Sequence, residues 1–476
     1  MTAQTILPAN SVVDSGYNVE NSLRFNSGSS DELTRTFVTA TSRKIFTLSF
    51  WLKRTVLGAA MSTFFGDTAG SNNADQNAFY FNANNAFVFG GWNNNFFTTT
   101  RLFRDTNAWY HFVIAVDTTQ GTASNRIKLY VNGTAQSYTS GNGFPAEDAD
   151  LGITKSGNHS WFGNDGQSGR SNGYLAEAVL IDGTALAPTS FGEFDEDSGI
   201  WKPKDDLADD LTFGNNGFYL QFKQSGTSQN SSGLGADTSG EDHHFAVANL
   251  TAVDQSTDTC TNNFATWNPL INSNGAITEG NLKYTTSNGS SNYGYRNTTI
   301  GVNKGKWYVE IKYTSSSVQA MVGIRSRLAT AVVHYLGYYA DDYGFYIDGS
   351  IFQANTDRGD LGASWGNDDI VGIYLDLDNN KLYFSKNGTL YTATGYDITA
   401  AASTTTGNYF FSATEWNSSG NGAFELNAGN PVSALANAAI TDDNGYGAFE
   451  YSPNITGDSA AKKFYALNTK NLAEFG

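Results

Sequence analysis

The chain lacks the residues that disulfides and membrane spans require. Only Cys260 among its 476 residues is a cysteine, so no intrachain disulfide can form. Secreted proteins rich in loops often carry disulfides, and their absence here favours assembly in a reducing cytoplasm. The segment Met1–Thr5 has no basic stretch followed by an apolar core, so we expect no signal peptide. No apolar run reaches the ~20 residues that cross a bilayer, so we expect no membrane insertion.

Basic residues are also scarce. The chain has 28 lysines and arginines against 46 aspartates and glutamates, which gives a formal net charge of -18. Binding of nucleic acid requires clustered lysine and arginine that release counterions, and the sequence contains no such cluster. We therefore expect no nucleic acid partner, and we interpret the acidity as a source of solubility.

The patterns that catalysis needs are missing as well. Five histidines and one cysteine show no spacing typical of zinc ligands. The sequence has no nucleophile elbow with Ser-His-Asp order, and no phosphate-binding loop follows a strand into a helix. These absences predict a protein that is not an enzyme.

Glycine and aromatic residues, by contrast, are abundant. The chain has 50 glycines, and 14% of its residues are Phe, Trp or Tyr, a composition that favours strands and tight turns over helices. Apolar residues alternate with polar ones in Phe46–Lys53, Tyr110–Val116 and Trp307–Tyr313, which is the period of half-buried strands. The sequence therefore predicts an all-β protein with very little helix. A chain of this length is too long for one core and predicts two domains.

Composition along the chain suggests five segments. Residues 224–243 are rich in Ser, Gly, Thr and Asp, which indicates a linker or long surface loop. We predict an N-terminal arm (1–15), a first β-sandwich (16–225), a polar linker (226–260), a second β-sandwich (261–430) and a C-terminal extension (431–476). Only residues 433–440 have clear helical propensity, for two turns at most.

Four motifs follow one another in the first half, at Thr47–Leu52, Trp109–Phe112, Ile127–Gly133 and Gly173–Glu177. Their order and spacing resemble the concanavalin A-like sandwich family often called LamG. The resemblance implies a jelly roll over residues 16–225, in which Trp51 and Trp109 anchor a sheet.

The second half contains Gly305–Ile311 and Asp376–Gly388, which resemble an early strand and the signature hairpin of a SPRY domain. This resemblance implies a second jelly roll. It also implies that Asp378, Asn379 and Asn380 form the hairpin turn.

Further stretches resemble proteins of marine bacteriophages that join these two domains; the stretches are Tyr17–Phe25, Phe191–Asp197 with Trp201–Lys204, Thr257–Thr266 and Ala466–Leu472. This resemblance implies a virion protein of the tail or capsid exterior. Together with the missing catalytic patterns, it leads to the hypothesis of a non-enzymatic virion structural protein in a tail, fibre or capsid appendage, assembled in the host cytoplasm. The expected partners are other virion proteins and copies of the chain, host cell-surface glycans, or both.

Aromatic residues in polar surroundings are the candidates for a binding site. Flat rings among amide side chains serve as sugar platforms and as anchors of protein interfaces. Two stretches, 91–97 and 334–339, have this character. From them we select Trp92, Phe96, Tyr338 and Tyr339 as ligand or interface residues, with packing into their own cores as the competing interpretation.

Acidic residues suggest two further hypotheses. Sandwiches of the first type often bind calcium at the rim, and Asp67, Asp75 and Asp117 are candidate ligands. Glucanases of the same fold use alternating carboxylates, as in Glu193, Asp195 and Asp197. Here the third position is Asp, not Glu, and the stretch has the composition of a loop. We therefore expect no catalytic residue.

Three functions remain open at this point. The first is the phage virion protein described above. The second is a bacterial surface or secreted carbohydrate-binding lectin, against which the absence of a signal peptide and of disulfides counts. The third, a glycan hydrolase, depends on the acidic stretch 193–197 alone.

Overall fold

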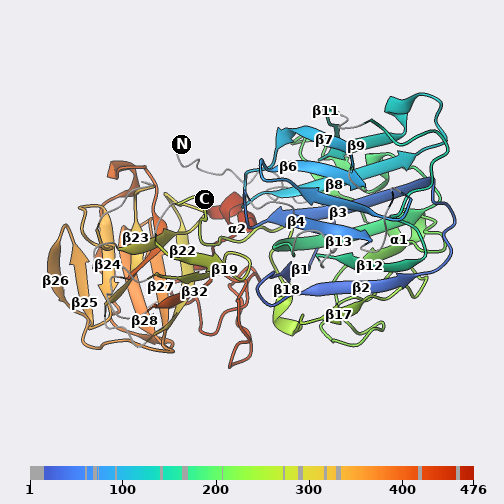
Figure 1. Cartoon of the computed structure of the whole chain (residues 1–476). Coiled ribbons are helices and arrows are strands. Elements are labelled where there is room, and N and C mark those ends of the chain that lie inside the picture. Colours follow the sequence, from blue (N-terminus) through green and yellow to red (C-terminus); the bar gives the residue numbers. More distant parts are fainter. Residues whose placement is uncertain are drawn as a thin grey trace. The chain divides into compact units, whose positions relative to one another are not determined.

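A computed structural model describes residues 16–476, apart from 59–61, 68–71, 73, 92–93, 140–142, 163–169, 206, 272–273, 288–292, 316–318, 329–333, 416–420 and 457–460. The described residues form two compact units, one ending at Asn262 and the other running from Asn263 to Gly476 (Figure 1). Each unit is a β-sandwich with its own core. The predicted all-β fold with two sandwiches is confirmed.

The N-terminal unit packs two eight-stranded antiparallel sheets. The first sheet has the order β10 (Thr134–Ala135), β9 (Ile127–Val131), β8 (Trp109–Asp117), β3 (Ile45–Arg54), β13 (Gly173–Asp182), β1 (Ser22–Phe25) and β18 (Gln255–Ser256), with β16 (Phe218–Leu220) beside β13. The second has the order β11 (Tyr138–Thr139), β7 (Asn94–Leu102), β6 (Ala86–Gly91), β5 (Asn77–Phe81), β4 (Ser62–Asp67), β12 (Gly157–Trp161), β2 (Glu32–Phe37) and β17 (Ala246–Ala248).

Short elements complete this unit. They are the hairpin of β14 (Gly192–Phe194) and β15 (Trp201–Pro203), the single-turn α1 (Leu207–Asp210), and the 3-10 turns Ala123–Asn125, Pro188–Ser190 and Ala252–Asp254. The core between the sheets is dominated by phenylalanines on alternate strand positions, such as Phe50, Phe87 and Phe112. Large rings on alternate positions bury much area per residue, which explains how a chain of modest hydrophobicity fills this core.

His111 lies on the other face of β8, in a second buried cluster with Trp51 and Trp201. Its Nδ1 accepts a hydrogen bond from the indole N–H of Trp201 at 2.9 Å, and its Nε2 lies 2.9 Å from Ser49 Oγ. Because Nδ1 is an acceptor, the ring is neutral and carries its proton on Nε2. Burial lowers the pKa of His111 to about 3.

The predicted linker 226–260 is instead part of the N-terminal unit. Its β17 pairs with β2, its β18 pairs with β1, and Leu234 and Phe245 are fully buried in the core. Asp258 forms a buried ion pair with Lys53, with 2.6 Å between Nζ and Oδ2, and accepts the indole N–H of Trp109. The prediction was wrong because a few widely spaced apolar residues anchor this polar segment.

The C-terminal unit also packs two sheets. The larger has the order β19 (Ala276–Thr278), β20 (Lys283–Thr285), β32 (Ala423–Asn427), β22 (Lys306–Thr314), β27 (Ile370–Asp376), β28 (Lys381–Lys386) and β29 (Thr389–Leu390), with β30 (Tyr396–Asp397) beside β28 and β33 (Tyr465–Ala466) parallel to β22. The smaller has the order β21 (Gly294–Asn297), β31 (Phe410–Glu415), β23 (Ala320–Arg325), β24 (Asp342–Tyr346), β25 (Ser350–Gln353) and β26 (Thr356–Asp360). A 3-10 turn covers Ala401–Ser403.

Strand β22 alternates as predicted. Trp307, Val309 and Ile311 lie in the core between the sheets, while Tyr308 faces a second cluster on the outer side. The hairpin from β27 to β28 turns at residues 377–380, where Asn380 has a φ of 54°. Asparagine tolerates this left-handed conformation, which explains its place at the turn.

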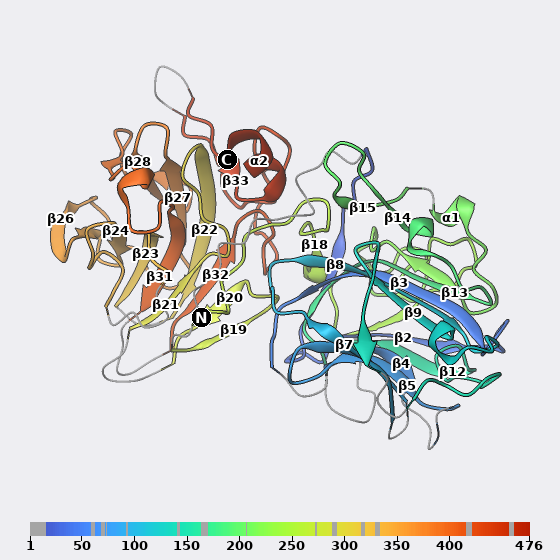
Figure 2. The same ribbon diagram turned by 90° about the horizontal axis from the view of Figure 1, so that it is seen from above.

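The predicted C-terminal extension covers the outer face of the larger sheet. Phe449, Ile455 and Phe464 pack there against Tyr308 and its neighbours, and the chain ends in helix α2 (Thr469–Phe475) (Figure 2). Residues 433–440, predicted to favour a helix, form no helix. In the described part of the chain, no helix is long and apolar enough to span a membrane.

Substitution of Asn380 by valine tests the hairpin. Valine resists a positive φ, so we expect Asn380→Val to lower the free energy of unfolding of the C-terminal unit by about 1–3 kcal/mol. Asn380→Gly, the control, keeps the conformation accessible and should behave like the wild type. Chemical denaturation of the three proteins measures the effect. A valine variant as stable as the wild type would contradict the assignment of the turn.

Acidification tests the neutral state of His111. The histidine has a pKa of about 3 when folded and about 6.5 when unfolded, so its stabilising contribution is complete above pH 6.5 and is lost as the pH falls. Between pH 7.5 and 5 the wild type should lose about 2 kcal/mol relative to His111→Gln, which cannot titrate there. Urea unfolding followed by tryptophan fluorescence measures the difference. Equal pH dependence in both proteins would show that His111 is not held neutral.

Candidate functional site

A cluster of rings lies on the connection between β23 and β24 in the C-terminal unit. We call residues 334–341 the aromatic loop. His334 and Tyr338 stack face to face with 3.6 Å between ring centroids, and Tyr339 meets Tyr338 edge-on at 5.2 Å. These rings are half-buried. Tyr338 and Tyr339, two of the predicted ligand residues, therefore lie together and remain partly accessible.

Two residues from outside the loop extend this cluster. The Arg327 guanidinium carbon lies 3.9 Å from the ring centroid of Tyr339, and the same side chain forms an ion pair with Asp341 at 3.5 Å. Tyr293, next to β21, contacts Tyr335 with 5.7 Å between centroids. The surface is therefore aromatic with polar and charged edges.

A buried ion pair fixes the start of the aromatic loop. Arg325, at the end of β23, donates to Asp342 at the start of β24, with 2.9 Å between Nε and Oδ2, and both side chains are fully buried. Its Nη2 donates to the backbone carbonyl of Tyr335 at 3.0 Å. Burial raises the pKa of Asp342 to about 6, and the Arg325 guanidinium opposes that rise. At neutral pH the pair is ionised and holds the loop backbone.

The turn between β25 and β26 holds the aromatic loop from the other side. Backbone N–H groups of Ala354 and Asn355 donate to the carbonyls of Tyr339 and Gly337, and the phenol of Tyr335 donates to the Asn355 side chain. Gly337 has a φ of 93°, and a Cβ there would lie 2.5 Å from the carbonyl oxygen of Phe352. The loop is therefore pinned at its backbone, which keeps the rings in fixed positions.

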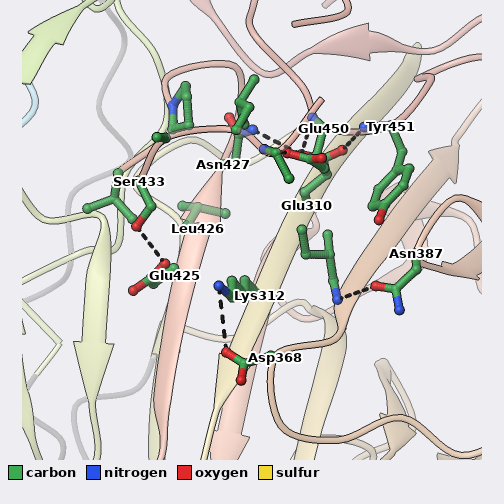
Figure 3. A pocket seen from close by; sticks show the side chains of 16 residues that line it. Glu310, Lys312, Asp368, Asn387, Glu425, Leu426, Asn427, Ser433, Glu450 and Tyr451 are labelled. Carbon is green, nitrogen blue, oxygen red and sulfur yellow. Dashed lines mark hydrogen bonds and ion pairs between the residues drawn. The ribbon is translucent and has the colours of Figure 1, made fainter. Parts of the chain in front are cut away.

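A second candidate site is a pocket of about 320 Å³ on the outer face of β22, β27 and β32 (Figure 3). Glu310 lies at one end, where its carboxylate accepts from the backbone N–H groups of Glu450 and Tyr451 and from the side chains of Asn427 and Tyr308. Burial raises the pKa of Glu310 to about 7, against the lowering effect of these donors. Glu310 joins the sheet to the segment that covers it.

The other end of the pocket carries exposed charge. Lys312 lies 3.6 Å from Asp368, and the side chain of Glu425 accepts from Ser433 at 3.1 Å and pairs with Lys283 at 3.0 Å (Figure 3). The pocket thus combines four carboxylates, one lysine and apolar walls. Such a site can bind a ligand by charge and shape.

Of the two predicted ligand residues of the first half, the structure describes one, Phe96. Phe96 is 1% exposed and packs in the core against Phe89, so its assignment as a ligand residue was wrong. Its side chain faces the core from strand β7. The polar residues that precede it in the sequence could not indicate this orientation. Trp92 lies outside the described residues.

Two of the calcium candidates, Asp75 and Asp117, bind separate partners. The carboxylate of Asp75 binds Lys155 at 2.9 Å and Asn72, while that of Asp117 accepts from Thr119 and Gln120 in its own turn. The side chain of Asp67 lies outside the described part. Among the described residues, no group of three or more His, Cys, Asp and Glu side chains could hold a metal ion.

The acidic stretch 193–197 forms a surface hairpin with β15. Lys202 lies 3.4 Å from both Glu193 and Asp195, and Ser198 donates to Asp195. Glu193 and Asp197 are exposed. Lys202 thus contacts both of the carboxylates that a glycosidase would use as its acid and its nucleophile.

Sequence reasoning missed Arg325, Asp342 and Glu310. A signal existed for Arg325, because an arginine at the end of the apolar run Val322–Ile324 needs a buried partner. Glu310 gave none, since a glutamate between Val309 and Ile311 has the pattern of an ordinary half-exposed strand.

Comparisons with known proteins agree with the two sandwiches. Residues 26–188 match the family model of the concanavalin A-like lectin/glucanases superfamily, and residues 304–425 match that of the SPRY domain. No curated protein matches the chain.

Solved structures resemble parts of the chain at low similarity. The SPRY domain of human HERC1 is 17% identical, with 30% of this chain and 87% of that one covered and a TM-score of 0.25. A candidate carbohydrate binding protein from Bacteroides ovatus is 13% identical, with 48% and 58% covered and a TM-score of 0.33. A heptameric SAP-like pentraxin from Limulus polyphemus is 13% identical, with 36% and 80% covered and a TM-score of 0.26.

The two family models match the two sandwiches in chain order. The chain therefore contains an N-terminal concanavalin A-like domain and a C-terminal SPRY domain.

Proposed function

We propose that the chain is a non-enzymatic binding protein that recognises glycans through the aromatic loop of its SPRY domain. The observation that carries this proposal is the set of half-buried rings at 334–339, held by the buried pair of Arg325 and Asp342. Rings fixed in this way bind without a large loss of conformational freedom, which favours affinity.

The chemistry of the aromatic loop suits a sugar. The C–H face of a pyranose packs on a flat ring, and its hydroxyls require donors and acceptors at the ring edge. Here the edge is supplied by Arg327, by the amide of Asn355 and by the imidazole of His334.

We further propose that the protein is displayed on the exterior of a phage particle, where it contacts other virion proteins and copies of itself. The support is the resemblance of Tyr17–Phe25, Thr257–Thr266 and Ala466–Leu472 to marine phage proteins. Neighbouring genes for portal, capsid and tail proteins are the expected result. Neighbours for secretion or polysaccharide use would favour the alternative of a bacterial surface lectin.

Removal of single rings tests the glycan site. Tyr338→Ala and Tyr339→Ala should each weaken binding of a glycan selected on an array by about tenfold or more, because each removes ring contact at a hot spot. Tyr130→Ala removes a half-buried tyrosine from the other domain and is the matched control. Isothermal titration measures the affinities. Wild-type affinity in both loop variants would reject the aromatic loop as the site.

An assay of hydrolysis tests the non-enzymatic assignment. Glu193 and Asp195 both contact Lys202 on a surface hairpin, which supports the non-enzymatic proposal. We expect incubation with β-glucans to release no reducing ends, and Glu193→Gln to give the same result. Hydrolysis by the wild type that disappears in Glu193→Gln would establish the glycosidase instead.

A further inference from the structure

The pocket beside Glu310 has an acidic lining. Glu310, Asp368, Glu425 and Glu450 contribute four carboxyl groups, and Lys312 is the one cation among the lining residues. Backbone donors already occupy Glu310 and Glu450, so Asp368 and Glu425 are the acceptors that face a ligand. Among the described residues, each carboxylate oxygen of Glu425 and Asp368 has one partner. A carboxylate oxygen can accept two donors, so both side chains can accept a further one. The charge of the pocket therefore suits a cationic ligand.

The walls of the pocket suit an aliphatic stem with a flat cationic end. Ile370 pairs with Lys312 on the neighbouring strand, and both Ile370 and the largely buried Val432 line the pocket. Tyr451 forms another part of the lining (Figure 3). A guanidinium binds carboxylates through two parallel hydrogen bonds and stacks on aromatic faces. These are the recognition elements of an arginine side chain.

An exposed apolar segment lies next to the pocket. Ala434, Ala436, Ala438, Ala439 and Ile440 are all exposed, and we call the segment 434–440 the apolar rim. Ile440 is 38% exposed. Glu450 accepts the backbone N–H groups of Ala436 and Asn437, which holds the rim open as a loop. An apolar patch beside a polar pocket is typical of a surface that contacts protein.

We propose that this pocket receives an arginine side chain of a protein partner, with the apolar rim packing against the residues that flank that arginine. The SPRY family model matches residues 304–425, and the apolar rim follows them in the chain. Part of this surface therefore lies outside the residues that match the model. It is separate from the aromatic loop, so it can hold a partner while the loop binds a glycan.

Capped arginine and its neutral isostere citrulline test the pocket directly. In saturation-transfer NMR on the full chain, N-acetyl-arginine methylamide should bind, and N-acetyl-citrulline methylamide should bind at least about twofold more weakly. Equal binding of the two compounds, or of neither, would overturn the proposal.

Charge variants test the sign of the pocket. Glu425→Gln and Asp368→Asn should weaken the arginine probe roughly two- to fivefold, while Lys312→Met should strengthen it by a similar factor. Asp368 has a φ of 65°, which asparagine tolerates, so that variant keeps its turn. Glu241→Gln, at an exposed acid of the other domain, is the matched control. Weaker binding of capped arginine in Lys312→Met would overturn the proposal, because removal of a competing cation should not weaken a cationic probe.

Peptides test the role of the apolar rim. A peptide with leucines flanking one arginine should bind more tightly than one with serines, and Ile440→Ser should remove that preference without changing the affinity for capped arginine. If Ile440→Ser still bound the leucine peptide more tightly than the serine peptide, the apolar rim would have no role in binding the flanking residues. Tyr338→Ala should leave all of these affinities unchanged, so failure of the arginine site and failure of the glycan site can be distinguished.

Discussion

The buried ion pair between Arg325 and Asp342 is the interaction on which the proposed binding surface depends. Burial of two charges costs several kcal/mol unless geometry and further hydrogen bonds offset it. Here the guanidinium also donates to the carbonyl of Tyr335, so one buried group joins two strands and the aromatic loop. The pair thus transmits the rigidity of the sheet to side chains that remain accessible at its surface.

Glu310 has a comparable role on the other sheet of the SPRY domain. Its carboxylate accepts backbone N–H groups of Glu450 and Tyr451, which ties the C-terminal segment across the outer face of β22. The side chain that anchors this segment thereby forms one end of the pocket. In both places a buried ionisable side chain holds a neighbouring segment at the surface. Neither Arg325 nor Glu310 is exposed enough to be the main contact of a ligand.

Local features of the fold were predictable, and features that depend on distant contacts were not. Strand alternation at Trp307–Tyr313 and the turn at Asn380 follow from neighbouring residues, and both were predicted. The segment 226–260 has a polar composition, but its pairing with distant strands decides its burial. Residues 433–440 have helical propensity, yet the carboxylate of Glu450 binds their backbone and holds a loop. For the site, the polar surroundings of Tyr338 indicated a ring that is not fully buried, and its ring is half-buried.

The central claim is that the buried pair positions the glycan site rather than merely stabilising the domain. The double variant Arg325→Met, Asp342→Leu tests it, because replacing both charges by apolar groups of similar size leaves no unpaired charge and is often neutral for stability. The measurement is glycan affinity by titration, with thermal unfolding of the same samples. We predict a folded SPRY domain that binds the glycan at least about tenfold more weakly, because the loop backbone has lost its donor. Wild-type affinity in the double variant, or a domain that no longer folds, would contradict it.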